Sequence, residues 1–261
     1  MILKWVGIIV IIVVIVAIAA LLLLSRLGRH KADKVKAVKG GIVQVSNSGC
    51  YIYGVKSGNK LLVFDGGIDE QGYALDALLN KLGVTRDQVT DVFLTHGHFD
   101  HVALVPLCMK ARTHLGIADV DMAAHKTPQM PRGARWASKL IPTPAVYITD
   151  PLVGRAEFDF GGERLLALPL PGHTPGSYLF VWKGVLIAGD SIHIYGDKLG
   201  FAQSVFSIDL PLSRRGMAKL KDELGTTIIE QVCTGHEGCT SPAETGRQLE
   251  DLIKRASLGQ N

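Results

Sequence analysis

Residues 95–101 read THGHFDH and place three of the chain's nine histidines, with an aspartate, inside one short segment. His96 and His98 stand two apart, so in an extended segment their side chains lie on one face and can reach one ion. Asp100 and His101 follow where the chain turns, and they point elsewhere. Neutral imidazole and carboxylate are ligands that zinc and related divalent ions prefer. The spacing therefore predicts two ligands for one metal and two for a neighbouring metal.

Other candidate ligands occupy similar places in the predicted structure. The heptapeptide overlaps the end of a predicted strand, DVFLT, and precedes a predicted helix over 102–111. His173 in PLPGHTPGS and His236 in CTGHEG lie on glycine-flanked turns, and Asp190 ends the strand-like stretch GVLIAGD. Taken singly, a histidine in a turn is more often solvated or hydrogen-bonded, and an aspartate after a strand is often a cap. Together they complete a set of seven candidate ligands.

Apolar periodicity predicts an α/β domain over residues 41–261. Residues 113–157 differ in character because they are rich in Pro, Met and basic side chains around Trp136, so we expect an inserted, partly helical lid there. Strands are predicted within 41–67 and at 91–95, 163–170, 177–182, 184–190 and 228–235, and helices at 70–83, 211–224 and 241–256.

These residues resemble the metallo-β-lactamase superfamily over roughly residues 42–255. The resemblance implies an α/β fold, a four-layer αββα sandwich with two metals at one edge of its two sheets. It also implies two divalent cations, most commonly zinc, with iron or manganese as other options. By this resemblance His96, His98 and His173 hold one metal, Asp100, His101 and His236 hold the second, and Asp190 bridges them.

The chemistry that follows is metal-assisted hydrolysis. Two cations that share a water lower its pKa from about 15.7 towards about 7 and so provide a hydroxide nucleophile. Asp100 can orient this hydroxide and carry its proton onward. A set with His101 and a bridging Asp190 looks like hydrolases of thioesters, lactones and phosphodiesters rather than the antibiotic-degrading members. We therefore expect cleavage of an ester-type bond in a small or lipid-like substrate.

Two further residues are catalytic candidates. Lactonases of the family commonly carry a Tyr three residues after the bridging Asp, whereas this chain has His193 there and Tyr195 two residues further on. Either side chain could donate a hydrogen bond to a developing oxyanion. The alternative is that either one packs or faces solvent.

Two other functions stay open on the sequence. One is an iron-dependent redox enzyme on the same scaffold, with oxygen or persulfide chemistry. The other is a non-catalytic partner in a membrane complex, in which the metals are structural. Visible absorbance and oxygen consumption would separate the redox enzyme from the hydrolase.

The N-terminal segment predicts a membrane anchor. Residues Trp5 to Leu24 are uncharged and mostly aliphatic, which matches the roughly 20 residues of a membrane-spanning helix. We therefore assign residues 1–25 to one transmembrane helix; a signal peptide cleaved near Ala17 to Ala19 is the alternative. Basic residues are concentrated after this segment, so the positive-inside rule predicts a single-pass membrane protein with a cytoplasmic hydrolase domain.

Charge is distributed unevenly along the chain. Residues 1–40 carry a net charge of +6, which leaves −2 for the remainder because the whole chain carries +4. A mildly acidic domain argues against nucleic-acid binding, which needs a basic face. Residues 26–40 form a predicted basic juxtamembrane linker that could contact an anionic membrane surface. A solvated linker is the alternative.

The four cysteines, Cys50, Cys108, Cys233 and Cys239, show no CxxC spacing. We expect reduced, partly buried thiols, which suits a cytoplasmic domain. If the predicted topology is wrong, Cys233 and Cys239 become a possible disulfide beside His236.

Overall fold

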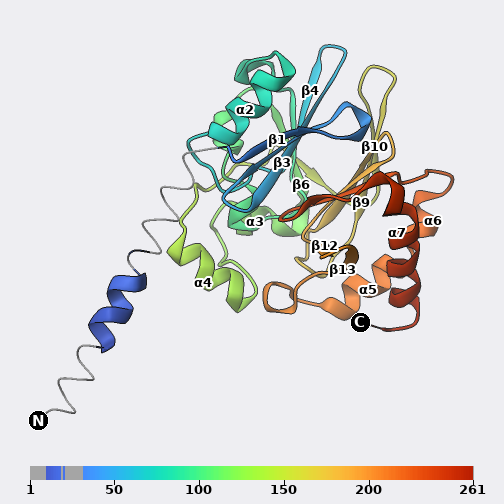
Figure 1. Cartoon of the computed structure of the whole chain (residues 1–261). Helices are drawn as coiled ribbons and strands as arrows, with labels where there is room; N and C mark the ends of the chain where they lie inside the picture. The colour runs from blue at the N-terminus through green and yellow to red at the C-terminus, as the bar shows by residue number, and fades with distance from the viewer. Residues whose placement is uncertain (1–9, 19, 21–31, 261) are drawn as a thin grey trace, which may run out of the picture.

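The computed structural model describes residues 10–18, 20 and 32–260. Residues 10–18 and 20 are helical, and residues 32–260 form a sandwich of two facing sheets (Figure 1). The first sheet has the strand order β1-β2-β3-β4-β5-β6-β7, so its strands follow the order of the chain. These strands are β1 (Lys34–Ala37), β2 (Val43–Asn47), β3 (Cys50–Ser57), β4 (Lys60–Phe64), β5 (Asp91–Phe93), β6 (Arg112–Gly116) and β7 (Asp150–Leu152).

The second sheet has the order β15-β14-β11-β10-β9-β8, and a separate hairpin joins β12 to β13. Most neighbours in this sheet are antiparallel, but β11 and β14 are parallel. Their carboxyl ends therefore meet at the same edge. The strands are β8 (Ala156–Asp159), β9 (Arg164–Pro169), β10 (Tyr178–Trp182), β11 (Val185–Gly189), β12 (Ile192–Tyr195), β13 (Lys198–Phe201), β14 (Gln231–Thr234) and β15 (Gly238–Cys239).

Side-chain alternation along the strands produces the four layers. In β4, Leu62 and Phe64 point into the core between the two sheets, while Leu61 and Val63 point to the outer face of the first sheet. In β10, Phe180 enters the core between the sheets and Leu179 faces outward. Because successive residues of a strand point to opposite faces, a strand that is apolar throughout must be covered on both sides. Helices provide this cover.

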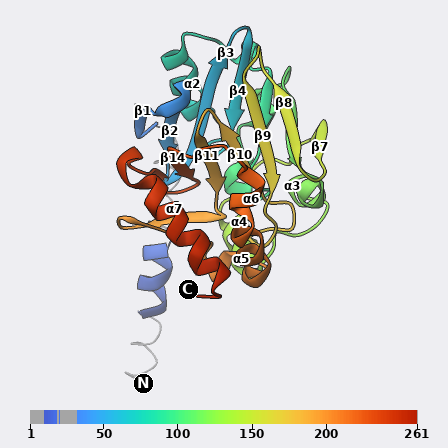
Figure 2. The ribbon, with the colours of Figure 1, turned by 90° about the vertical axis from the view of Figure 1, so that its right-hand side faces the viewer.

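The outer layers are helical. Helix α2 (Tyr73–Leu82) covers the first sheet, while α5 (Leu210–Ala218), α6 (Leu220–Leu224) and α7 (Pro242–Ser257) cover the second, as Figure 2 shows. These elements confirm the α/β sandwich predicted from the sequence. The remaining helices are α3 (Val120–Ala123), α4 (Arg132–Leu140) and the short 3-10 helices at Lys39–Gly41, Arg86–Gln88, Phe99–His101, Val105–Leu107, Ile117–Asp119 and Ser204–Phe206.

The segment 102–111 differs from the helix expected there. The backbone N–H groups of Ala103 and Leu104 donate to the carbonyls of Gly67 and Gly66 at 3.1 Å each. These bonds replace the hydrogen bonds to the fourth preceding residue that an α-helix needs. The chain therefore forms only 3-10 turns around Pro106.

Residues 113–157 are also more regular than the predicted lid insertion. Strands β6 and β7 and the start of β8 belong to the two sheets, and β7 pairs with β6 in parallel. Helices α3 and α4 lie between β6 and β7. Only the part around α4 borders the cavity described below.

The predicted basic linker, residues 26–40, contains a strand. Residues 34–37 form β1, which pairs antiparallel with β2 from Lys34 opposite Ser46 to Ala37 opposite Val43. Lysines on an exposed edge strand discourage pairing with other chains, which suits this position. The sheet thus begins before residue 41, the predicted start of the domain.

No helix among the described residues has both the length and the apolar character to cross a bilayer. This finding contradicts the predicted single-pass membrane localisation, together with the cytoplasmic placement that depended on it. Residues 1–9, 19 and 21–25 of the predicted anchor and residues 26–31 of the linker lie outside the described residues.

Cysteine chemistry also differs from the main expectation of four thiols. Cys233 in β14 and Cys239 in β15 form a disulfide, because the two strands pair directly at this position. Cys50 and Cys108 are free and buried.

Candidate metal centre

All seven predicted ligands lie at one edge of the sandwich. The segment 95–101 leaves β5, the loop between β9 and β10 carries His173, and the ends of β11 and β14 carry Asp190 and His236. The loops pack closely here: a Cβ on Gly235 would lie 2.1 Å from an oxygen of Asp190. A residue without a side chain is therefore required between His236 and the strand.

Three histidine nitrogens form a triangle. Nε2 of His96 lies 3.0 Å from Nδ1 of His98. Nε2 of His173 lies 3.2 Å from Nε2 of His96 and 3.0 Å from Nδ1 of His98. A neutral ring nitrogen either donates or accepts, so three nitrogens in mutual contact cannot form three hydrogen bonds. Nitrogens bound tetrahedrally to zinc at about 2.0–2.1 Å would lie about 3.3–3.4 Å apart. The triangle thus matches a metal site.

The other ring nitrogens fix the tautomers of His96 and His98. Nδ1 of His96 lies 3.1 Å from Oγ1 of Thr95, whose hydroxyl already donates to the Asp65 carboxylate at 2.9 Å. The Thr95 oxygen must therefore accept from His96. Nε2 of His98 donates to the carbonyl of Met130 at 2.6 Å. In both rings the nitrogen in the triangle keeps its lone pair.

The third ring follows the same logic. The hydroxyl of Ser207 donates to the carbonyl of Gln203 at 2.6 Å, so its oxygen accepts from Nδ1 of His173 at 3.1 Å. Nε2 of His173 therefore also carries a lone pair. Three lone pairs directed at one point repel one another unless a cation lies between them.

Burial supports the neutral state of these rings. Burial is the main influence on the pKa of His96 and of His173, and nearby imidazoles act in the same direction, so both pKa values lie well below 6.5. Burial likewise lowers the pKa of His98. Neutral imidazole is the form that binds a metal.

A second group of ligand atoms lies beside the triangle. Nδ1 of His101 donates to the Asp65 carboxylate at 3.1 Å, and Nδ1 of His236 donates to the carbonyl of Gly49 at 2.9 Å. Their Nε2 atoms face Asp190, with separations of 3.3 Å for His101 and 3.1 Å for His236. Nε2 of His101 and Oδ1 of Asp190 are buried without a hydrogen-bond partner.

Asp190 and Asp100 make this second group acidic. Asp100 Oδ2 lies 3.5 Å from Nε2 of His236, and Asp190 Oδ2 also lies 3.7 Å from Nε2 of His173 in the triangle. Asp190 therefore reaches both groups of ligands. Burial lowers the pKa of His101, but the charges of Asp190 and Asp65 outweigh it and raise that pKa well above 6.5. The carboxylates of this second group therefore favour a bound cation.

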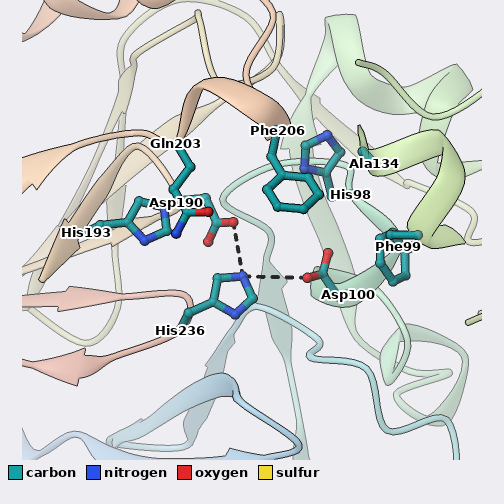
Figure 3. Close-up of a pocket in the computed structure, with 10 residues that line it drawn as sticks. His98, Phe99, Asp100, Ala134, Asp190, His193, Gln203, Phe206 and His236 are labelled. Carbon is teal, nitrogen blue, oxygen red and sulfur yellow. Dashed lines mark hydrogen bonds and ion pairs between the residues drawn. The ribbon is translucent and has the colours of Figure 1, made fainter. Parts of the chain in front are cut away.

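A cavity of about 250 Å³ opens over the second group (Figure 3). The polar groups that line it include Asp100, His193 and His236, from three different segments. Its remaining lining residues are His98, Phe99, Ala134, Ala137, Asp190, Gln203 and Phe206.

The two predicted catalytic candidates on β12 differ in position. His193 is buried in the cavity wall; its Nδ1 lies 3.0 Å from Oε1 of Glu237, and its Nε2 has no partner. Tyr195 is half exposed and does not line the cavity. Its hydroxyl donates to the carbonyl of Phe201 at 3.2 Å. Burial raises the pKa of Glu237, but the hydrogen bond and charge of His193, together with hydrogen bonds from Thr234 and the Ile194 backbone, outweigh burial and lower that pKa.

The sequence interpretation missed several residues that hold the ligands in place. Asp65 supports His101 directly and His96 through Thr95, and its only signal was an aspartate at a strand end. Asp119 joins the two histidine loops because it accepts from the N–H groups of Gly97 and Gly176 at 2.8 Å each. No local signal identified Asp119.

Comparison with known proteins agrees with this fold. The family model described as the metallo-β-lactamase superfamily matches residues 45–223. The solved structure of BJP-1, a subclass B3 metallo-β-lactamase of Bradyrhizobium japonicum, has a TM-score of 0.64 and 18% identity, and the match covers 89% of this chain and 94% of that one. At this identity the likeness concerns the fold alone.

Two curated relatives are named as hydrolases. A hydroxyacylglutathione hydrolase of Anaeromyxobacter dehalogenans is 32% identical over 38% of this chain, and the match spans only 31% of that protein. A probable polyketide biosynthesis zinc-dependent hydrolase, BaeB, of Bacillus velezensis is 22% identical over 81% of each chain. The family model covers more than half of this chain, and the cluster of ligand residues suits metal-dependent hydrolysis. The chain therefore belongs to the metallo-β-lactamase superfamily.

Proposed function

We propose that this protein is a dinuclear metal-dependent hydrolase that cleaves an ester-type bond, with zinc as the resident metal. The observation that carries the proposal is the convergence of three imidazole rings. The surrounding hydrogen bonds fix the tautomer of each ring, so that its lone pair points at one common position. The relative named as a zinc-dependent hydrolase supports the choice of zinc.

Each ligand has an assigned place. The triangle of His96, His98 and His173 would hold one cation. Asp100, His101 and His236 would hold the second, and Asp190 would bridge the two because its carboxylate faces both groups.

Two cations at these positions would lower the pKa of a shared water towards about 7 and polarise the substrate carbonyl. Asp100 lines the cavity and can take the proton of the attacking water and pass it to the leaving group. His193 lines the cavity, and a hydrogen bond with Glu237 fixes the orientation of its ring. Its Nε2 atom has no hydrogen-bond partner. We assign catalytic roles to Asp100 and His193, and none to Tyr195.

The cavity lining favours an uncharged acyl group. Phe99, Phe206, Ala134 and Ala137 supply apolar walls, and no Lys or Arg is among the described residues that line the cavity. Apart from the two proposed metal ions, an anionic phosphodiester would meet no cationic group there, whereas a thioester or lactone needs none. Among the three ester types, we therefore expect thioesters and lactones to be cleaved best.

The test combines metal analysis with a substrate panel. The full chain should bind two equivalents of zinc and hydrolyse neutral thioesters or lactones. His98→Ala should lose at least about 100-fold in kcat/KM because one ligand of the triangle is gone, while His125→Ala, an exposed histidine outside the cluster, should match the parent.

Hydrolysis by His98→Ala at the parental rate would refute the mechanism. Iron in the purified protein, with visible absorbance and oxygen consumption but no ester hydrolysis, would instead identify the iron-dependent redox enzyme.

A further inference from the structure

We propose that Cys50 is a thiolate ligand of the second metal, beside Asp100 and His236. This inference rests on the proposed dinuclear hydrolase and adds a sulfur donor to its second metal position. It makes the two positions chemically different, because the triangle offers three nitrogens and no sulfur.

The geometry brings the three donors together. The sulfur of Cys50, a carboxylate oxygen of Asp100 and a ring nitrogen of His236 lie within 4.8 Å of one another. Zinc binds sulfur at about 2.3 Å and nitrogen or oxygen at about 2.0–2.2 Å, so neighbouring ligand atoms on one ion lie about 3.0–3.7 Å apart. A shift of about an ångström in the side chains would close the site.

The backbone holds Cys50 at this place. The turn between β2 and β3 has positive φ angles of 51° at Ser48 and 81° at Gly49, which suits a tight two-residue hairpin turn. Next to this turn, the N–H of Tyr51 donates to the carbonyl of Gly235 at 2.9 Å, and the carbonyl of Gly49 accepts from the His236 ring. The chain on both sides of Cys50 is thus bonded to the loop that carries His236.

The environment of the thiol agrees with a ligand. Cys50 is only 5% exposed, and its sulfur is directed at the ligand atoms of Asp100 and His236, each within 4.8 Å. The other free cysteine, Cys108, is equally buried but packs in the apolar layer under α2, with no ligand cluster around it among the described residues.

The binding step is a ligand exchange without redox change. The S–H bond of Cys50 breaks, its proton passes to solvent, and the sulfur electron pair forms the bond to the cation. A sulfur ligand favours zinc, cobalt and cadmium over manganese and magnesium. The second position should therefore discriminate between these metals more strongly than a position with only oxygen and nitrogen ligands.

The test replaces zinc with cobalt(II) in the full-length protein, without added thiol reagents. Two equivalents of cobalt should give a near-ultraviolet sulfur-to-cobalt charge-transfer band that grows in with occupancy of the second position. Cys50→Ser should abolish this band and weaken binding of the second equivalent, on the order of 10- to 100-fold. Cys108→Ser, the matched control, should keep the band.

The outcomes separate the two proposals. A parent protein that binds two cobalt ions and hydrolyses esters without any sulfur-to-cobalt band overturns the role of Cys50 and leaves the hydrolase standing. Persistence of the band in Cys50→Ser overturns that role too. A parent protein that binds no cobalt or zinc overturns both proposals. The parental spectrum decides the question even if Cys50→Ser does not fold.

Discussion

At the scale of single residues, the candidate metal centre depends on hydrogen bonds that point away from it. Each triangle histidine uses its outer nitrogen as a donor, to Thr95, to the carbonyl of Met130 or to Ser207. The inner nitrogen of each ring is then left with its lone pair in place before any metal arrives. Outer partners of this kind orient ligands and increase their basicity.

Thr95→Val provides a test of this support. The variant keeps the shape of the side chain but removes the oxygen that accepts from His96 and donates to Asp65. We expect zinc affinity to fall on the order of 10- to 100-fold, because the His96 ring loses its orientation and fixed tautomer. Competition with a chelator measures this affinity. The control is Thr90→Val, which removes a hydroxyl that bonds the backbone of Leu61 at the opposite end of β5 from residues 95–101, and this variant should bind zinc like the parent. Equal affinity of both variants would contradict the assigned role of Thr95.

At the scale of the elements, strands β5 and β6 share a buried charge. The carboxylate of Asp91 is fully buried and lies 3.0 Å from Nε2 of His114 and 2.7 Å from Arg112. Burial alone would raise the pKa of Asp91, but the hydrogen bonds with His114 and Thr90 and the charge of Arg112 together outweigh burial and lower that pKa. The cluster joins two neighbouring strands, and β5 leads directly into the segment 95–101.

Asp91→Asn should therefore destabilise the fold, by about 1–3 kcal/mol at neutral pH, because hydrogen bonds to a charged group are lost. A carboxyl whose pKa is lower in the folded state adds stability above its unfolded pKa of 3.8, and this stability is lost as the pH falls through the folded pKa. Urea unfolding at several pH values measures the effect. The gap between parent and variant should be full at pH 7 and shrink below about pH 4. A gap that does not depend on pH would contradict the ion-pair explanation.

The elements also show what sequence patterns can and cannot predict. Short, continuous apolar runs in β4 and β10 and the periodic apolar face of α2 predicted these elements, because burial is reflected in local composition and spacing. The helix expected over 102–111 fails because Ala103 and Leu104 bond to Gly67 and Gly66, more than thirty residues earlier. Asp119 was missed for the same reason.

At the scale of the whole molecule, the candidate metal centre joins the two halves of the sandwich. His96, His98 and His101 follow β5 of the first sheet, while Asp190 and His236 follow strands of the second sheet. The sheets also meet through an apolar core that includes Phe64, Phe93, Phe180 and Trp182. Cations bound at this edge would therefore link the two sheets through ligands from each.

Metal removal should then lower the stability of the whole fold and not only that of the loops. A ligand that binds the folded state alone adds about 2.7 kcal/mol when its free concentration is 100 times its Kd. Stripping the protein with a chelator should lower its Tm by several degrees, and zinc should restore the Tm in proportion to the logarithm of its free concentration. Differential scanning calorimetry measures this dependence. His173→Ala, which removes the second sheet's contribution to the triangle, should respond much less to zinc, whereas His125→Ala should respond fully. The same Tm with and without zinc would show that the metals do not join the sheets. A cation bound to ligands from both sheets must oppose the separation of the sheets, and it must therefore raise the Tm.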